Sequence, residues 1–124
     1  MQGYPDENDL LALFECEPIL LDSTEKDVPL FYNEATFQIS NQEEDFIVII
    51  SPSHRKVKIQ VTHRASAEVT TLLDLKRVDH FEIVADNRNR SRVLLRSVDD
   101  DFTQTIEIDF KPRFKLIVKE HSIN

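Results

Sequence analysis

The sequence predicts an α+β protein that is mainly β: a curved antiparallel meander sheet or open barrel of seven to eight strands, with one short N-terminal helix. From residue 30 onward, apolar and polar residues alternate with a period of two, which is typical of half-buried strands. Clusters of Asn, Asp, Ser and Pro separate these segments. The connections are short, whereas parallel strands need crossovers of a dozen residues or more. A β-sandwich of two sheets is the alternative arrangement.

The length of 124 residues suits one domain. We expect residues 1–124 to comprise an acidic helix and connection (1–29), an antiparallel β meander (30–119) and a short tail (120–124). No apolar run approaches the roughly 18 residues of a membrane span, and the first residues lack the features of a secretory signal. The single cysteine, Cys16, excludes an internal disulfide. These features predict a soluble, cytoplasmic protein.

The N-terminal region carries the signals of one helix. Asp6 and the acids that follow it are suited to the first turn of a helix. Leu10, Leu13 and Phe14 have the i, i+3, i+4 spacing of one apolar helical face. Pro18 disfavours helix at and before its own position, so we expect a helix over residues 6–16. An irregular acidic connection, residues 19–29, should follow it.

The alternating segments predict strands near residues 30–39, 46–51, 57–61, 69–75, 80–85, 92–98, 103–110 and 114–119. Residues 46–51 are apolar on both faces, which is typical of a central strand covered on each side or of the seam of a curled sheet. Residues 69–78 are ambiguous, because Leu72, Leu75 and Lys76 could equally lie on a helical turn. With Gly3 as the one glycine, we expect Asn and Asp in residues 86–89 and 99–101 to adopt left-handed backbone in the turns.

The residues that would form a catalytic or metal site are sparse. The four histidines have neither the H-x-H nor the H-x-x-x-H spacing of zinc ligands, and residues 99–101 lack the alternation and glycine of a calcium loop. A chain with one glycine has no G-x-S-x-G motif and no phosphate-binding loop. The sequence therefore predicts a protein that is not an enzyme and that has no cofactor and no metal. A small ligand-binding barrel, or an enzyme using carboxylates with His63 or His80 in a cavity, is a further alternative.

The charge is unevenly distributed. The chain has a net charge of −8, but residues 1–45 contain twelve acids against one base, Lys26. That balance argues against binding to the phosphate backbone of nucleic acids and to membrane surfaces, which need dense positive charge. It favours electrostatically steered association with a basic protein.

Four arginines, Arg88, Arg90, Arg92 and Arg96, are expected on one face of a strand. No aromatic residues alternate with them, so they do not form a base-stacking platform. We expect them either to protect an exposed edge strand or to face the acidic N-terminal segment.

Small size, a β-rich domain, the lack of a catalytic motif and the acidic N-terminal region together predict a non-enzymatic protein-binding domain. Its most concrete form is an immunity or antitoxin-type inhibitor that captures a basic toxin enzyme through an acidic face. A structural or assembly subunit of a larger complex is the alternative, and a homo-oligomer is compatible with both. The predicted partner-binding residues combine negative charge with neighbouring aliphatic side chains: Asp22, Glu25, Asp27, Glu43, Glu44 and Asp45.

Overall fold

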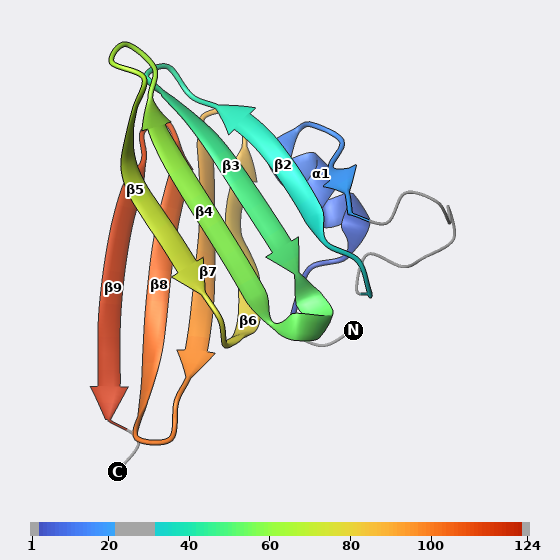
Figure 1. Ribbon diagram of the computed structural model, residues 1–124, viewed down its shortest axis with the longest axis vertical. Helices are drawn as coiled ribbons and strands as arrows, with labels where there is room; N and C mark the ends of the chain where they lie inside the picture. Colours follow the sequence, from blue (N-terminus) through green and yellow to red (C-terminus); the bar gives the residue numbers. More distant parts are fainter. Residues whose placement is uncertain (1–2, 22–31, 123–124) are drawn as a thin grey trace.

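The computed structural model describes residues 3–21 and 32–122, which contain one α-helix, one short 3₁₀ helix and nine strands (Figure 1). The helices are α1 (Glu7–Phe14) and η2 (Pro52–His54). The strands are β1 (Ile19–Leu20), β2 (Ala35–Ser40), β3 (Glu44–Ser51), β4 (Lys56–His63), β5 (Glu68–Leu75), β6 (Val78–Asn87), β7 (Arg90–Val98), β8 (Phe102–Lys111) and β9 (Lys115–Ser122).

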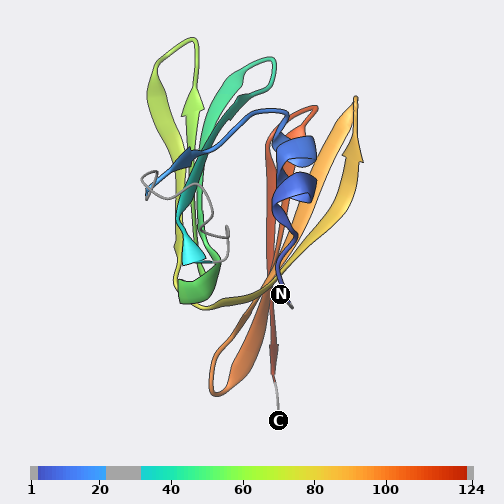
Figure 2. The ribbon, with the colours of Figure 1, turned by 90° about the vertical axis from the view of Figure 1, so that its right-hand side faces the viewer.

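The strands form two antiparallel sheets that face each other (Figure 2). The first sheet has the order β1-β2-β3-β4-β5 and the second β6-β7-β8-β9, with every neighbouring pair antiparallel. The predicted class, mainly antiparallel β with one short N-terminal helix, is confirmed. The sheets do not close into a barrel, so the arrangement is the two-sheet alternative.

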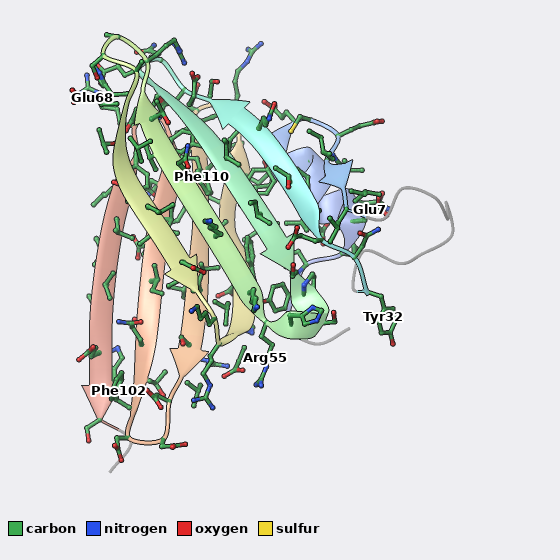
Figure 3. The ribbon with its side chains drawn as sticks, in the orientation of Figure 1. Glu7, Tyr32, Arg55, Glu68, Phe102 and Phe110 are labelled. Atoms are coloured by element: carbon green, nitrogen blue, oxygen red, sulfur yellow. The ribbon has the colours of Figure 1, made fainter. Side chains whose placement is uncertain are left out.

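The meander is interrupted between β5 and β6. Only Lys76 and Arg77 connect these strands, a length typical of a hairpin, yet the chain crosses here to the second sheet. Arg55, directly after η2, holds the crossing: its carbonyl accepts a hydrogen bond from the Val78 N–H (2.8 Å), and its guanidinium donates to Asp79 (3.0 Å). Figure 3 shows Arg55 at this end of the molecule.

The helix occupies the space between β2 and β6. Asp6 is its N-cap and accepts a hydrogen bond from the Asp9 N–H (2.8 Å). The predicted apolar face, Leu10, Leu13 and Phe14, is buried. The helix ends earlier than Pro18 requires, because Glu15 adopts a left-handed conformation (φ 54°) and its N–H bonds to the Leu11 carbonyl.

The core lies between the two sheets and contains five phenylalanines among its 19 buried apolar residues. Phe14 contacts both Phe37 of the first sheet and Phe110 of the second, with ring centroids 4.6 Å and 5.6 Å apart. Phe46 meets Phe110 edge-on at 5.3 Å. Burial alternates along β2, β3 and β4 as the period of two predicts.

Several predicted boundaries change. Ile19 and Leu20 form a strand rather than part of an irregular connection, because they pair with Thr36 and Ala35 at the edge of the first sheet. The ambiguous residues 69–75 form a strand, which pairs with β4. The last strand reaches Ser122, so most of the predicted tail belongs to the second sheet.

The predicted left-handed Asn and Asp residues do not occur in the turns at residues 86–89 and 99–101. In the described residues the left-handed non-glycine positions are Glu15, Arg55 and Ala67, not Asn or Asp. The Asn87 side chain instead accepts the Asn89 N–H (3.0 Å), and the Asp99 side chain accepts the Asp100 N–H (2.7 Å). These side chains stabilise their turns by hydrogen bonding, which removes the need for left-handed backbone.

The arginine prediction is wrong on both counts for Arg92. Its strand, β7, lies between β6 and β8 and is not an edge. Its guanidinium donates to both carboxylate oxygens of Asp109 and lies 3.4 Å from Glu107, both on β8. The partner of Arg92 is therefore the neighbouring strand, not the acidic N-terminal region.

No helix in residues 3–21 and 32–122 is long and apolar enough to cross a membrane.

Candidate partner-binding surface

The predicted acidic residues Glu43, Glu44 and Asp45 lie at the hairpin turn between β2 and β3. Asn41 organises this turn, because its side-chain oxygen accepts the N–H groups of Glu43 (3.0 Å) and Glu44 (2.8 Å). Its amide nitrogen donates across the core opening to the Phe110 carbonyl (2.9 Å). The turn is thus fixed to the second sheet.

Two of these three acids are used inside the fold. One Glu44 oxygen accepts both the Asn41 amide and the Phe114 N–H, each at 3.2 Å. Asp45 accepts the Ser40 hydroxyl at 2.6 Å and the Arg64 guanidinium at 3.2 Å. The Ser40 hydroxyl first, and then Arg64, lowers the pKa of Asp45 below its ordinary value.

Arg64 joins the two neighbouring turns of the first sheet. Besides Asp45, its guanidinium donates to the carbonyl oxygens of Asn41 (2.6 Å), Gln42 (3.0 Å) and Glu44 (3.3 Å). This cation offsets one of the three negative charges of Glu43, Glu44 and Asp45. Glu43, whose side chain is exposed, is the acid of this group best placed to meet a partner.

The other predicted acids, Asp22, Glu25 and Asp27, lie outside the described residues. The residues that flank them, Leu21 and Tyr32, are exposed at the β1–β2 edge, and Figure 3 shows Tyr32 pointing outward there. This end of β2 is about 20 Å from the β2–β3 turn, at ~3.3 Å per strand residue. Leu21 and Tyr32 therefore lie at the opposite end of the β2–β3 hairpin from the acids Glu43, Glu44 and Asp45.

The outward side of the five-stranded sheet is a second candidate surface, which we call the outer face. Cross-strand pairing places Gln38, Ile47, Gln60 and Leu72 in one row across it. A neighbouring row contains Ile19, Thr36, Ile49, Lys58 and Asp74. Ile19 is 61% exposed and Leu72 57%. Apolar side chains surrounded by amides, hydroxyls and charges have the composition of a protein interface.

The outer face explains why β3 is apolar on both sides. Its inward residues, Phe46, Val48 and Ile50, are buried in the core as predicted for a central strand. Its outward residues, Ile47 and Ile49, are only half-buried, and no second layer covers them in the part of the chain that the structure describes. The prediction of cover on both sides is therefore wrong for the described residues. The apolar residues on both sides of β3 were the sequence signal for this face. Leu72 gave no such signal, because residues 69–78 were equally compatible with a helical turn.

His63 and His80 do not form a shared cavity. His63 pairs with Glu44 in the first sheet, whereas His80 pairs with Arg96 in the second. Within residues 3–21 and 32–122, no group of three or more His, Cys, Asp or Glu side chains is arranged to hold a metal ion.

His80 instead lines an open groove of about 470 Å³ beside β6, together with Asp9, Glu82 and Asp86. Glu82 and Asp86 belong to the same strand as His80, but Asp9 comes from the N-terminal helix more than 70 residues earlier, so the sequence did not group it with them.

The fold defines the class of this chain as an antiparallel two-sheet β protein with one N-terminal helix. No protein-family model and no curated protein matches the sequence. The structure is similar to a chain of the contact-dependent growth inhibition toxin–immunity protein complex from Klebsiella pneumoniae 342. The two chains share 18% sequence identity and superpose with a TM-score of 0.73 over 94% of this chain and 95% of the other. At this identity the likeness is one of fold.

The lowered pKa of Asp45 generates a pH-dependent prediction. A depressed carboxyl pKa stabilises the fold above the ordinary value of about 3.9, and this contribution is lost as the pH falls through the folded-state pKa. Asp45→Asn should therefore be less stable than the wild type at neutral pH, with the difference shrinking toward zero in acid. Urea denaturation across this pH range measures the effect. Glu43→Gln is the control, and an equal loss of stability at every pH would contradict the electrostatic cause.

Proposed function

We propose that this chain is an immunity-type inhibitor: a non-enzymatic protein that captures a basic toxin enzyme in the cytoplasm and blocks it. The observation that carries the proposal is the fold likeness to a chain of a toxin–immunity protein complex, which extends over nearly the whole of both chains. The net charge of −8 agrees with capture of a basic partner.

The separate positions of the histidines support the inhibitor rather than the toxin role. His63 and His80 lie on different sheets, and the described residues contain no metal-binding cluster. An inhibitor needs a stable shape and a complementary surface but no reacting groups. Both sheets share one packed core, which supplies such a rigid frame.

The proposed contact surface combines charge with apolar area. Asp22, Glu25 and Asp27, with the exposed Glu43, would guide the approach of a basic enzyme, since rim charges act mainly on the association rate. The outer face, with Ile47 and Ile49 at its centre, would supply the apolar contact that slows dissociation. Glu44 and Asp45 are assigned a lesser role, because their carboxylates already accept hydrogen bonds within the fold.

The apolar outer face also favours a second candidate function, that of an assembly subunit in a larger complex. Salt separates the two functions, because steered capture of a basic enzyme weakens as ionic strength rises while an apolar subunit interface does not.

The first test is to capture the partner from the lysate of the source cell with the full chain as bait, at low and then high salt. We expect one basic enzyme in stoichiometric amount, whose activity the purified chain abolishes and whose toxicity co-expression of the chain prevents. Recovery of salt-insensitive complex subunits, or an enzyme that stays active when bound, would contradict the inhibitor proposal.

The second test reverses Asp22, Glu25 and Asp27 to Lys in one variant. Steering predicts at least about tenfold slower association at low salt, with little change in the dissociation rate. The matched control reverses Asp100 and Asp101 of the β7–β8 turn and Glu120 of β9, three exposed acids, and so changes the net charge equally. Stopped-flow or surface plasmon resonance measures both rates. Equal effects of the two variants would show that total charge, not this acidic segment, governs association.

The third test places a charge at the centre of the outer face. Ile47→Lys should weaken the complex by at least about tenfold (~1.4 kcal/mol), mainly through faster dissociation. The control is Val84→Lys, an exposed apolar residue of the second sheet. Thermal unfolding of both variants checks that the fold is retained. Unchanged affinity of Ile47→Lys would exclude the outer face as the contact.

A further inference from the structure

The β6–β7 turn carries arginines that neither the core nor the proposed contact surface uses. Arg88 lies in this turn and Arg90 is the first residue of β7, and both side chains are exposed. Unlike Arg92, neither forms an ion pair with an acid of the described residues. The surroundings of these two guanidinium groups therefore decide what they can bind.

Three turns enclose a groove beside Arg88, which we call the turn groove. The β2–β3, β6–β7 and β8–β9 turns lie at the same end of the two sheets (Figure 2). The hydrogen bond from the Asn41 amide to the Phe110 carbonyl (2.9 Å) ties the first of these turns to the second sheet. The groove has a volume of about 410 Å³, and apart from one proline its lining residues are polar or cationic: Asn41, Gln42, Arg88, Asn89, Lys111 and Pro112.

The turn groove is lined by two cations and by no acid of the described residues. Within that part of the chain the guanidinium of Arg88 has all its N–H donors available, and Lys111 gives one ammonium hydrogen to Glu15 (3.0 Å), which leaves two. The acids Glu43 and Asp86, which are close to the lining residues in sequence, line other grooves. In a chain with a net charge of −8, the turn groove is therefore a local site of positive charge.

Two side-chain amides complete the donor set of the turn groove. Gln42 and Asn89 are exposed, and their side-chain amides form no hydrogen bond within residues 3–21 and 32–122. Their backbone is nevertheless held in place. Arg64 donates to the Gln42 carbonyl (3.0 Å), and the Asn89 N–H donates to the Asn87 side chain (3.0 Å). The groove thus presents cationic and neutral donors on backbone that folding has already fixed.

We propose that the turn groove binds the phosphate group of a small phosphorylated molecule. The Arg88 guanidinium donates two parallel hydrogen bonds to two phosphate oxygens, and the Lys111 ammonium supplies the second positive charge. The Gln42 and Asn89 amides donate to the remaining oxygens. A phosphate monoester carries a charge of about −2 at neutral pH, which matches both cations. A carboxylate has one charge and two oxygens, so it would leave one of the two cations without a partner.

The acids around the groove restrict the ligand to a small molecule. Glu43 and Glu44 directly follow Gln42 in the chain, and Glu15 lies beside Lys111. A nucleic-acid strand needs a continuous cationic track, and it would bring further phosphates against these carboxylates. A single phosphate group in the groove avoids that repulsion.

The test is a titration of the full chain with inorganic phosphate and with uridine 5′-monophosphate, followed by backbone amide NMR at constant ionic strength. We expect saturable shifts confined to residues 41–42, 88–90 and 111–113. Arg88→Gln should weaken binding by about tenfold or more, because the charge and the paired hydrogen bonds are both lost. Arg88→Lys should weaken it less, by about threefold, because the charge stays while the planar fork is lost.

Arg96→Gln is the matched control, because it changes the net charge equally. Arg96 is an exposed arginine about 20 Å along β7 from Arg90, at ~3.3 Å per strand residue. This variant should bind phosphate as tightly as the wild type. Thermal unfolding without phosphate checks that Arg88→Gln and Arg96→Gln both keep the wild-type stability.

Shifts that rise without saturation up to about 50 mM phosphate, or an equal loss in Arg88→Gln and Arg96→Gln, would overturn the proposal. So would binding of uridine as tight as that of its 5′-monophosphate, because the phosphate would then not be recognised. A single-stranded oligonucleotide that binds more tightly than the mononucleotide would overturn the assignment to a small ligand. Equal affinities for inorganic phosphate and the mononucleotide support recognition of the phosphate alone, and tighter binding of the mononucleotide supports a phosphate ester. The turn groove is not part of the outer face, so this proposal and the inhibitory function can fail separately.

Discussion

Aromatic packing joins the two sheets and positions both the helix and the β2–β3 turn. Phe14 of the helix touches one phenylalanine from each sheet, and Phe46 extends the contact from Phe110 to Phe114 at 5.9 Å. Aromatic pairs of this geometry add about 0.5–1.5 kcal/mol beyond the burial of their area. Because the cluster joins α1, β2, β3 and β8, it fixes the helix between the sheets and sets the position of the hairpin turn that carries Glu43.

The sheet edges on the side of the helix are covered by other parts of the chain. The helix, β1 and the Gly3 carbonyl, which accepts the Phe81 N–H, cover the edges at β2 and β6. Within the described residues, the outer face and the edges at β5 and β9 are left uncovered. A sheet supported from behind by a packed core changes shape little on binding, which limits the entropy lost in forming a complex. The proposed inhibitory function needs such a preformed surface.

The count of acidic residues predicts where negative charge gathers in the sequence, but not which acids are free to contact a partner. The sequence groups Glu43, Glu44 and Asp45, and the structure places Glu43 exposed in the β2–β3 turn and Glu44 and Asp45 half-buried at the start of β3. Which of them is available to a partner depended on Arg64, about 20 residues away, and on Asn41. Composition sums charges along the chain, whereas availability depends on which neighbours folding brings within hydrogen-bond distance. The acidic groove beside His80 was undetectable for the same reason.

Most of the local structure follows from patterns along the chain. The period of two predicted most of the strands and the buried faces of β2, β3 and β4, but left β5 ambiguous. The spacing of Leu10, Leu13 and Phe14 predicted the helix and its packing face. The division of the strands into two sheets after Leu75 does not follow from such patterns. The connection there is as short as a hairpin, and alternation states which side of a strand is buried but not which strand lies beside it. The Arg55 hydrogen bonds at the crossing and the core that both sheets share stabilise this division.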